Sequence, residues 1–177
     1  MTALSRILIV ALAVAAPALA AQTASTAAPA PAPACPPTAT LDQLITAIDA
    51  AVSGPADKDR TCLRDVLLPE ARLIPVGKRP DGTIAPRILS VDGWIDAVRK
   101  RGSGVFYERQ IKVKTEVYGP VAHLWSTYEV RPTPDGKAEV RGINSIQAVY
   151  DGARWRVIEI TWHAETPADP VPAQYLP

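Results

Sequence analysis

Apolar and polar residues alternate along the chain with two different periods, and the first half shows the helical one. The spacing predicts amphipathic helices over residues 40–54, 57–68 and 90–102, each ended by glycine or proline. Thr40 and Gln43 form a capping-box pattern at the start of the first helix. The first half of the domain is therefore expected to be mainly helical.

The second half alternates with a period of two, which is typical of strands with one buried face. Glycine, proline and aspartate clusters separate the segments, as expected for an antiparallel meander. Two shorter strands, each containing a proline, flank an earlier Pro-Asp-Gly turn. The predicted strands are 71–78, 83–89, 106–119, 121–131, 138–150 and 154–163.

Helices followed by a long antiparallel sheet indicate the α+β class, in which the helices cover one face of the sheet. We expect three N-terminal helices packed on a strongly curved, mainly antiparallel sheet. The length from about residue 40 to 165 suits one domain with a single core.

The ends of the chain differ in composition from this domain. Residues 1–20 contain one cation, Arg6, and a short apolar run that ends in small residues, which predicts a cleaved signal peptide. Residues 21–39 are rich in Ala and Pro and are expected to be a linker. Residues 166–177 form a Pro-rich tail after the domain at 40–165. These features predict a secreted or periplasmic protein without a membrane span after signal removal.

Charge and histidine content exclude several classes of function. Loss of Arg6 with the signal leaves 18 basic against 18 acidic residues, without the surplus of cations that a nucleic-acid-binding protein needs. Only His123 and His163 are present, and they lack metal-ligand spacing. We therefore expect no nucleic acid, no metal and no cofactor.

The two cysteines, Cys35 and Cys62, belong to a chain expected in an oxidising compartment. A disulfide between them would join the end of the linker to the second helix. By the chain-entropy estimate it would stabilise the folded state by about 3 to 4 kcal/mol. Two unrelated thiols are the alternative. A catalytic thiol is disfavoured because no activating base lies near either cysteine in sequence.

The segments "VAHLWSTYEVR" and "RGINSIQAVYDGARWRVIEITW", together with the opening helices, resemble the nuclear transport factor 2-like superfamily. This superfamily includes ketosteroid isomerase-like and SnoaL-like proteins. The resemblance covers roughly residues 40–164. It implies a cone in which helices close a bent sheet around a pocket that some members use for catalysis and others for binding, often as dimers. It does not name the chemistry of the pocket.

Strand register decides which residues enter such a pocket. A three-residue turn at 151–153 would pair Ile146 with Ile158, Asn144 with Ile160 and Gly142 with Trp162. The same register turns the odd-numbered residues of 106–119 and the even-numbered residues of 121–131 inward. The polar and aromatic residues of this apolar inner wall, and hence the candidate ligand-binding residues, are Tyr107, Arg109, Tyr128, Asn144 and Trp162. The alternative is that they are satisfied polar groups of the core.

The inner face in this register carries no Asp or Glu. A proton-abstracting enzyme needs a poised acceptor beside its substrate, so the missing carboxylate argues against catalysis. If the register were shifted, His123 would become the best general base, with Glu159 or Glu129 to orient it. If the domain is an enzyme of the kind that the resemblance implies, Tyr128 and Arg109 are the candidate oxyanion donors.

The outer face in this register carries Trp125 and Trp155 among polar residues, which suggests a homodimer surface. The first functional hypothesis is an exported domain, non-catalytic or weakly catalytic, that binds a small apolar or carboxylated molecule. The second is a ketosteroid isomerase-like isomerase, dehydratase or lyase. The third is an envelope interaction scaffold without a ligand.

Overall fold

The structure is a computed structural model that describes residues 34–102 and 104–177. The predicted signal peptide, 1–20, and the linker up to residue 33 lie outside the described residues. Residues Ala34–Pro177 make one compact unit, which extends beyond the predicted domain limits of 40–165 at both ends.

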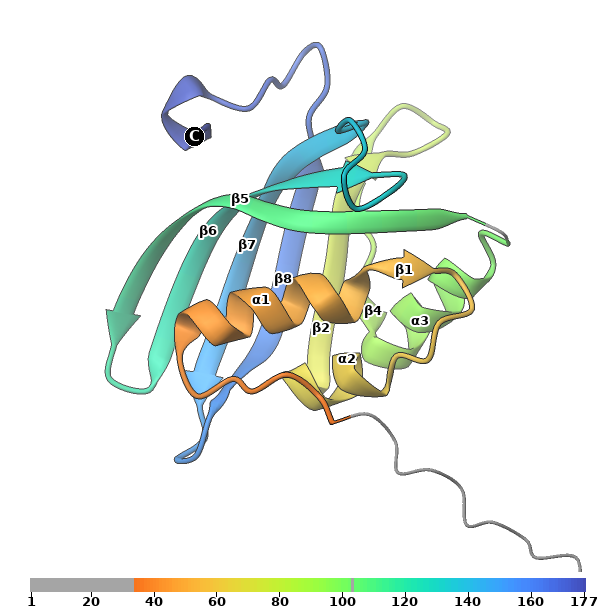
Figure 1. Cartoon of the computed structure of the whole chain (residues 1–177). Coiled ribbons are helices and arrows are strands. Elements are labelled where there is room, and N and C mark those ends of the chain that lie inside the picture. The colour runs from red at the N-terminus through yellow and green to blue at the C-terminus, as the bar shows by residue number, and fades with distance from the viewer. Residues whose placement is uncertain (1–33, 103) are drawn as a thin grey trace, which may run out of the picture. The chain divides into compact units, whose positions relative to one another are not determined.

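Within the described ranges, three α-helices lie on one side of a curved sheet that does not close on itself (Figure 1). The helices are α1 (Leu41–Val52), α2 (Thr61–Val66) and α3 (Val91–Arg99), and a short 3-10 turn covers Ala173–Tyr175. The strands are β1 (Gly54–Pro55), β2 (Leu67–Lys78), β3 (Ile84–Pro86), β4 (Leu89–Ser90), β5 (Val105–Tyr118), β6 (Val121–Arg131), β7 (Val140–Tyr150) and β8 (Trp155–Ala164).

The strand order is β1-β5-β6-β7-β8-β2-β3, with β4 paired to β2. Neighbours pair antiparallel except β2 and β8, which are parallel. The predicted fold class and the four-strand meander are confirmed. We call the side covered by the helices the inner face and the opposite side the outer face.

Side-chain caps set the starts of α1 and α3. Thr40 Oγ1 accepts from the Gln43 backbone N–H at 3.2 Å, and the Gln43 side chain accepts from Thr40 N–H, so the predicted capping box is present. Ser90 caps α3 by accepting from Gly93 N–H at 3.1 Å. Gly102 follows α3 with a φ of 72°, the left-handed conformation expected at a helix stop.

Helix α2 is shorter than predicted, and Pro69 does not end it. The helix stops at Val66, and β2 begins at Leu67 and runs through Pro69. At its start, Asp59 accepts from both the backbone and the hydroxyl of Thr61 and forms a turn that delays the helix. The prediction over 57–68 was therefore too long at both ends.

The core lies between α1–α3 and the inner face. Its fully buried members include Leu44 and Ile48 of α1, Ile95 of α3, and Leu124 and Ile146 of the sheet. Burial of such aliphatic side chains stabilises the fold by about 1.5 to 3 kcal/mol each. The helices are thus fixed on the sheet by one continuous apolar contact.

The register of the four-strand meander contains two irregularities that the sequence pattern did not reveal, and the pairing of β2 with β8 shifts as well, between Leu67 and Arg72. Strand β5 has an extra residue at Ile111, and β8 has one at Ile158. The loop after β7 also holds four residues, 151–154, so that Tyr150 pairs with Trp155. Each extra residue reverses the facing of everything beyond it along the strand.

The pairing predicted between β7 and β8 was consequently wrong. Asn144 pairs with Trp162, Ile146 with Ile160 and Gly142 with Ala164. Ile158, expected on the inner wall, is 42% exposed because it is the extra residue of the bulge. Asn144 and Trp162 themselves still face inward.

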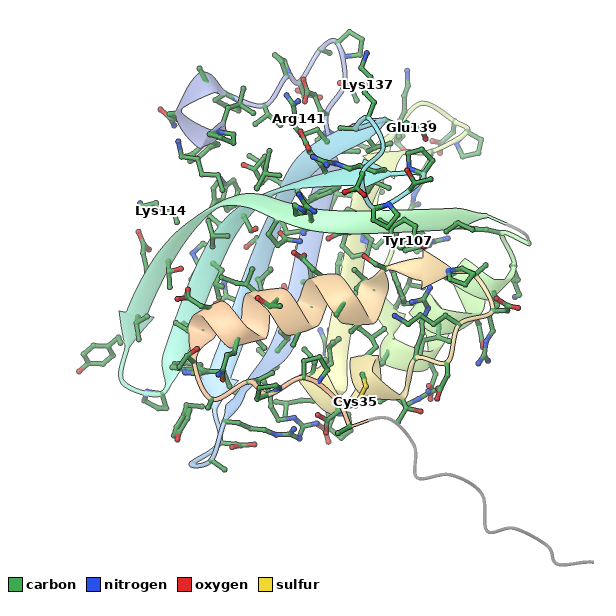
Figure 2. All side chains as sticks on the ribbon, viewed as in Figure 1. Cys35, Tyr107, Lys114, Lys137, Glu139 and Arg141 are labelled. Atoms are coloured by element: carbon green, nitrogen blue, oxygen red, sulfur yellow. A yellow bond between two sulfur atoms is a disulfide. The ribbon has the colours of Figure 1, made fainter. Side chains whose placement is uncertain are left out.

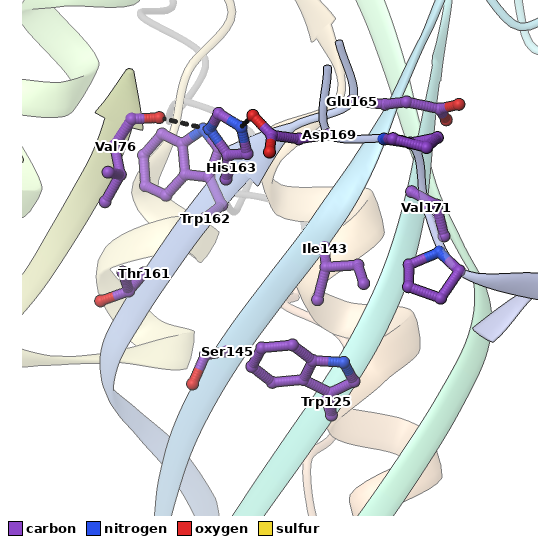
Figure 3. Close-up of a pocket in the computed structure, with 12 residues that line it drawn as sticks. Val76, Trp125, Ile143, Ser145, Thr161, Trp162, His163, Glu165, Asp169 and Val171 are labelled. Atoms are coloured by element: carbon purple, nitrogen blue, oxygen red, sulfur yellow. Dashed lines mark hydrogen bonds and ion pairs between the residues drawn. The ribbon is translucent and has the colours of Figure 1, made fainter. Parts of the chain in front are cut away.

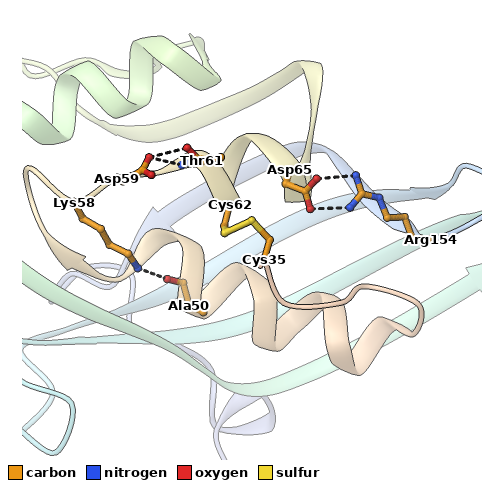
Figure 4. The surroundings of a disulfide bond; sticks show 8 residues. All are labelled: Cys35, Ala50, Lys58, Asp59, Thr61, Cys62, Asp65 and Arg154. Carbon is orange, nitrogen blue, oxygen red and sulfur yellow. Dashed lines mark hydrogen bonds and ion pairs between the residues drawn. A yellow bond between two sulfur atoms is a disulfide. The ribbon is translucent and has the colours of Figure 1, made fainter. Parts of the chain in front are cut away.

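The predicted disulfide between Cys35 and Cys62 is present and ties the chain before α1 to α2 (Figure 4). Close to it, the Arg154 guanidinium contacts the Asp65 carboxylate at 2.7 and 2.9 Å. Thr38 is buried, and its carbonyl accepts from Trp155 N–H at 2.8 Å. The residues just before α1 are therefore part of the folded unit.

The C-terminal segment lies along the outer face. Thr127 Oγ1 donates to the Tyr175 carbonyl at 2.6 Å, and Lys112 Nζ donates to the Leu176 carbonyl at 2.5 Å. The ring of Tyr175 lies 6.1 Å from that of Trp125. In the described part of the chain, no helix combines the length and hydropathy needed to cross a bilayer.

Candidate functional site

A cavity of about 270 Å³ lies between the inner face and helices α1 and α3. Apolar side chains make most of its wall, and a few polar groups converge on it, which is the usual composition of a small-molecule site. The lining residues are Ile48, Val52, Leu73, Trp94, Arg101, Phe106, Glu108, Tyr128, Val130, Val140, Asn144, Ile160, Trp162 and Ala164.

Three of the five predicted ligand-binding residues, Tyr128, Asn144 and Trp162, line this cavity. The other two do not: Tyr107 and Arg109 line a separate depression next to the polar side of α1. Figure 2 shows Tyr107 on β5. Their predicted facing was wrong because the bulge at Ile111 reverses the first part of β5.

The same reversal brings Glu108 into the cavity, so the prediction of an inner face without acids was wrong. Glu108 pairs with Val130 of β6, and Gln110 pairs with Tyr128. The backbone at Glu108 is held by Ser53 at the end of α1, whose hydroxyl accepts from Glu108 N–H at 2.8 Å. The carboxyl is therefore positioned by both the sheet and α1.

The Glu108 carboxyl belongs to a network of side-chain amides. Its Oε1 accepts from Gln110 Nε2 at 2.9 Å and from Asn144 Nδ2 at 3.2 Å. Asn144 also donates to Gln110 Oε1 at 3.2 Å, and Ser126 donates to the same oxygen. Among the described residues, Oε2 of Glu108 has no hydrogen-bond partner. One oxygen is thus held in place while the other remains available to a ligand.

A second acid, Asp49 of α1, joins the network through Gln110. Gln110 Nε2 donates to Asp49 Oδ1 at 3.1 Å, and the Gln110 backbone N–H donates to the same carboxyl at 3.1 and 3.2 Å. One amide group therefore bridges two carboxyls. No signal in the sequence linked Asp49 to residues 61 positions further along the chain.

Burial makes these acids hard to ionise. It raises the pKa of Glu108 to about 7, and the neighbouring charge of Asp49 adds to this effect. Burial also raises the pKa of Asp49 to about 6, although the Gln110 hydrogen bonds oppose it. At neutral pH, Glu108 is populated in both protonation states, as a general acid–base requires.

Tyr128 supplies a hydrogen-bond donor in the same cavity. Burial and then the charge of Glu108 raise the pKa of its phenol well above the ordinary value, so the hydroxyl keeps its proton. The ring lies directly over Gly142 of β7. A Cβ at that position would meet the Tyr128 hydroxyl at 2.6 Å and the His163 carbonyl at 2.3 Å. Only glycine therefore allows this placement of the ring.

The outer face has a larger groove, of about 400 Å³, between the sheet and the C-terminal segment (Figure 3). His163 Nδ1 lies 2.9 Å from the Val76 carbonyl, and its Nε2 lies 3.5 Å from Asp169. The wall is otherwise mainly apolar, with Trp125 and Ile143 on the sheet. Its two acids already lie near basic side chains, Glu165 at 3.8 Å from Arg141 and Asp169 at 3.5 Å from His163, so the groove is the weaker candidate for proton transfer.

The two tryptophans predicted to share an outer surface lie on different faces. Trp125 is on the outer face and borders the groove, near Tyr175. Trp155 packs against the inner core, because the loop before β8 is one residue longer than predicted and reverses the facing of the start of β8. The alternative general base, His123, lies on the outer face, with Nε2 3.1 Å from Ser145 Oγ. The homodimer stays a prediction, but Trp125 and Trp155 cannot form one continuous surface for it because they lie on opposite faces of the sheet.

Residues 34–102 and 104–177 contain no group of three or more His, Cys, Asp or Glu side chains arranged to hold a metal ion. The polar side chains that line the cavity include the Glu108 carboxyl, the Asn144 amide, the Tyr128 phenol and the Arg101 guanidinium, and Asp49 joins the network through Gln110 without lining the cavity. What this set can do without further components is bind a polar group and transfer a proton.

Solved structures give the clearest likeness. One is an NTF2-like protein of unknown function from Pseudomonas putida KT2440, 14% identical, with a TM-score of 0.53 over 72% of this chain and 87% of that one. Another is a protein of unknown function with a cystatin-like fold from Nostoc punctiforme PCC 73102, 12% identical, with a TM-score of 0.53 over 74% and 92%. No protein-family model matches the chain, and no curated protein matches it. The arrangement of helices and strands and the likeness to these solved structures show that the chain has the nuclear transport factor 2-like fold.

Proposed function

We propose that the domain binds a small apolar molecule in the inner cavity and catalyses proton transfer on it, with Glu108 as the acid–base. The observation that carries the proposal is a carboxyl with a pKa of about 7 in the wall of a mainly apolar cavity. A group whose pKa lies near the working pH accepts and returns a proton efficiently.

The proposed reaction is the transfer of a proton from a carbon beside a carbonyl group. Glu108 Oε2 takes the proton, and the electron pair of the C–H bond moves toward the carbonyl oxygen. Tyr128 donates a hydrogen bond to that oxygen, where negative charge develops. Return of the proton from Glu108 to another carbon gives an isomer, and departure of a leaving group gives an elimination product.

Asn144 has a positioning role in this scheme. It is 4% exposed and donates to both Glu108 and Gln110, so it fixes the orientation of the carboxyl. An amide donor also favours the ionised carboxylate, which keeps the pKa of Glu108 from rising further. We assign no proton transfer to Asn144.

The test is deuterium exchange at carbon in heavy water, followed by NMR with 2-tetralone, a small bicyclic ketone. The wild type should accelerate exchange beside the carbonyl, and Glu108→Gln should lower the rate by about 10²- to 10⁴-fold. Glu116→Gln is the matched control, because Glu116 is exposed and pairs with Lys114 on the far half of β5.

Binding without turnover is the second candidate function. It is favoured by the fixed hydrogen bonds of Glu108 Oε1, which also suit a static anchor for a ligand. Protection of the protein against thermal unfolding by 2-tetralone, without any exchange that depends on Glu108, would support binding and overturn the catalytic proposal.

We also propose that the protein works outside the cytoplasm, secreted or in a periplasm. The apolar N-terminal run and the disulfide between Cys35 and Cys62 support this location. Fractionation of the expressing cell should recover the disulfide-bonded form in the exported fraction. Recovery of the reduced protein in the cytoplasm would contradict it.

A further inference from the structure

The mouth of the inner cavity carries an arginine that the proposed reaction does not use. Arg101 follows α3, is exposed, and lines the cavity beside Phe106, with its guanidinium 5.9 Å from the centre of that ring. Among the described residues, Arg101 forms no ion pair with a carboxylate. A charged side chain held at a cavity rim without a partner is free to meet an anion.

A second guanidinium contacts the same aromatic ring from within the protein. Arg60 is 1% exposed and donates to three backbone carbonyls, at 3.0 Å to Ala51, 3.0 Å to Val52 and 3.2 Å to Pro55. It lies 5.9 Å from the centre of the Phe106 ring. Its partners are neutral, so none of them cancels its charge.

The cavity therefore has a positive end. Burial lowers the pKa of Arg60, and the nearby positive charges of Arg99 and Arg101 lower it further. The three guanidinium groups are therefore close enough to interact. Of the acids in the described chain, Glu108 alone lines the cavity. Apolar walls strengthen the field of such uncompensated charges.

We infer that the substrate of this site is an apolar molecule that carries a carboxylate, and that Arg101 binds the carboxylate at the cavity mouth. The inference rests on the proposed function of Glu108. A guanidinium matches a carboxylate with two parallel hydrogen bonds, which favours this anion over a neutral polar group.

The strand geometry sets the shape of such a substrate. Phe106 and Glu108 are two residues apart on the same face of β5, which corresponds to about 6.6 Å along the strand. Arg101 lies beside Phe106, and Glu108 is the proton acceptor. The carboxylate and the reactive carbon are therefore on opposite sides of a small ring system rather than adjacent.

Arg109, which the sequence suggested for an anion, does not serve here because it lies outside the cavity. Arg99 is the matched control for Arg101. It belongs to the same helix end and is about half exposed, but it contacts Asp96 at 3.9 Å and does not line the cavity.

The experiment compares two probes of the same shape, 2-naphthoate and 2-naphthamide, by isothermal titration calorimetry. The wild type should bind naphthoate roughly tenfold more tightly than naphthamide, and Arg101→Gln should remove that preference. Arg99→Gln should leave the preference unchanged. Equal affinities in the wild type, no binding of either probe, or an equal effect of Arg99→Gln would overturn the inference.

The calorimetry and the deuterium-exchange experiment on Glu108 can fail independently of each other. Exchange of 2-tetralone that depends on Glu108, together with equal binding of both naphthalene probes, would remove the carboxylate inference and leave the reaction in place. A preference for naphthoate that depends on Arg101, without exchange, would leave an anion-binding pocket and remove the reaction.

Discussion

Two glutamates on neighbouring strands occupy sheltered sites on opposite faces of the sheet. On the inner face, Glu108 accepts from two side-chain amides and has a second acid nearby. On the outer face, Glu129 is 9% exposed and contacts Arg131 at 2.7 Å and Arg141 at 3.2 Å. The pKa of Glu108 rises to about 7, whereas hydrogen bonds from Arg131 are the main reason that the pKa of Glu129 falls below its usual value.

The difference has two causes: burial is the main reason that the pKa of Glu108 is raised, whereas hydrogen bonds and ion pairs with two arginines lower the pKa of Glu129. Two guanidinium groups stabilise a permanent anion on the outer face, which serves structure. On the inner face, burial and the neighbouring charge of Asp49 raise the pKa of Glu108 toward neutral pH although the amide donors oppose them, which suits proton transfer. The two glutamates should therefore respond in opposite ways to the same substitution.

Glu129→Gln should cause the largest change in stability. It leaves two mostly buried guanidinium groups without their counter-charge, and we expect the free energy of unfolding to fall by about 2 to 3 kcal/mol at pH 7. Urea unfolding measures it. Glu116→Gln removes an exposed pair and should change stability by less than about 0.5 kcal/mol. Equal effects of the two substitutions would show that the outer cluster is not a structural ion pair.

Glu108→Gln should instead stabilise the protein above neutral pH, by about 2 kcal/mol at pH 8, because the folded state no longer holds a buried carboxylate. The pKa of Glu108 is raised by folding, so its contribution to stability is complete below about pH 4.5 and is lost as the pH rises through about 7. Chemical denaturation across pH 5 to 8 measures this slope.

The pH dependence of Glu129 has the opposite sign. Its pKa is lowered by folding, so its contribution is present above the unfolded value of 4.5 and is lost as the pH falls below it. The slope between pH 5 and 8 should consequently flatten in Glu108→Gln and persist in Glu129→Gln. A slope that persists unchanged in Glu108→Gln would place the titrating group elsewhere.

The smallest expected effect concerns Thr127, which fixes the C-terminal segment on the outer face. Thr127→Ala removes its hydrogen bond to the Tyr175 carbonyl and should cost about 1 kcal/mol. Hydrogen exchange should show faster exchange within residues 166–177, whereas Ser126→Ala, on the adjacent inner position, should leave that segment unchanged. Equal protection in both variants would show that the segment is held by other contacts.

The sequence predicted the elements well because their caps and periods are local. The capping box at Thr40, the cap at Ser90 and the alternation of the long strands all depend on residues a few positions apart. The fold class follows from the order of these elements. The disulfide could be proposed because both cysteines lie in a chain expected to be oxidised.

The site could be predicted only in part. The face of the sheet on which a strand residue lies depends on the register, and one extra residue in a bulge reverses it. Tyr128 and Asn144 lie on β6 and β7, which pair with each other without a register shift, so both residues face inward as predicted. Tyr107, Arg109 and Glu108 precede the bulge at Ile111, which reverses them. One signal was available: Phe106 and Val113 are an odd number of positions apart, so both can pack on the core only if the strand slips between them.

The most direct test of the account is the titration of Glu108 itself, followed by the carbon-13 NMR signal of its side-chain carboxyl in the folded protein. We expect a midpoint near pH 7, and a lower midpoint in Asp49→Asn, because the neighbouring charge is removed. A midpoint near the ordinary value of 4.5 in the wild type would contradict the account, since the cavity would then hold a permanent anion.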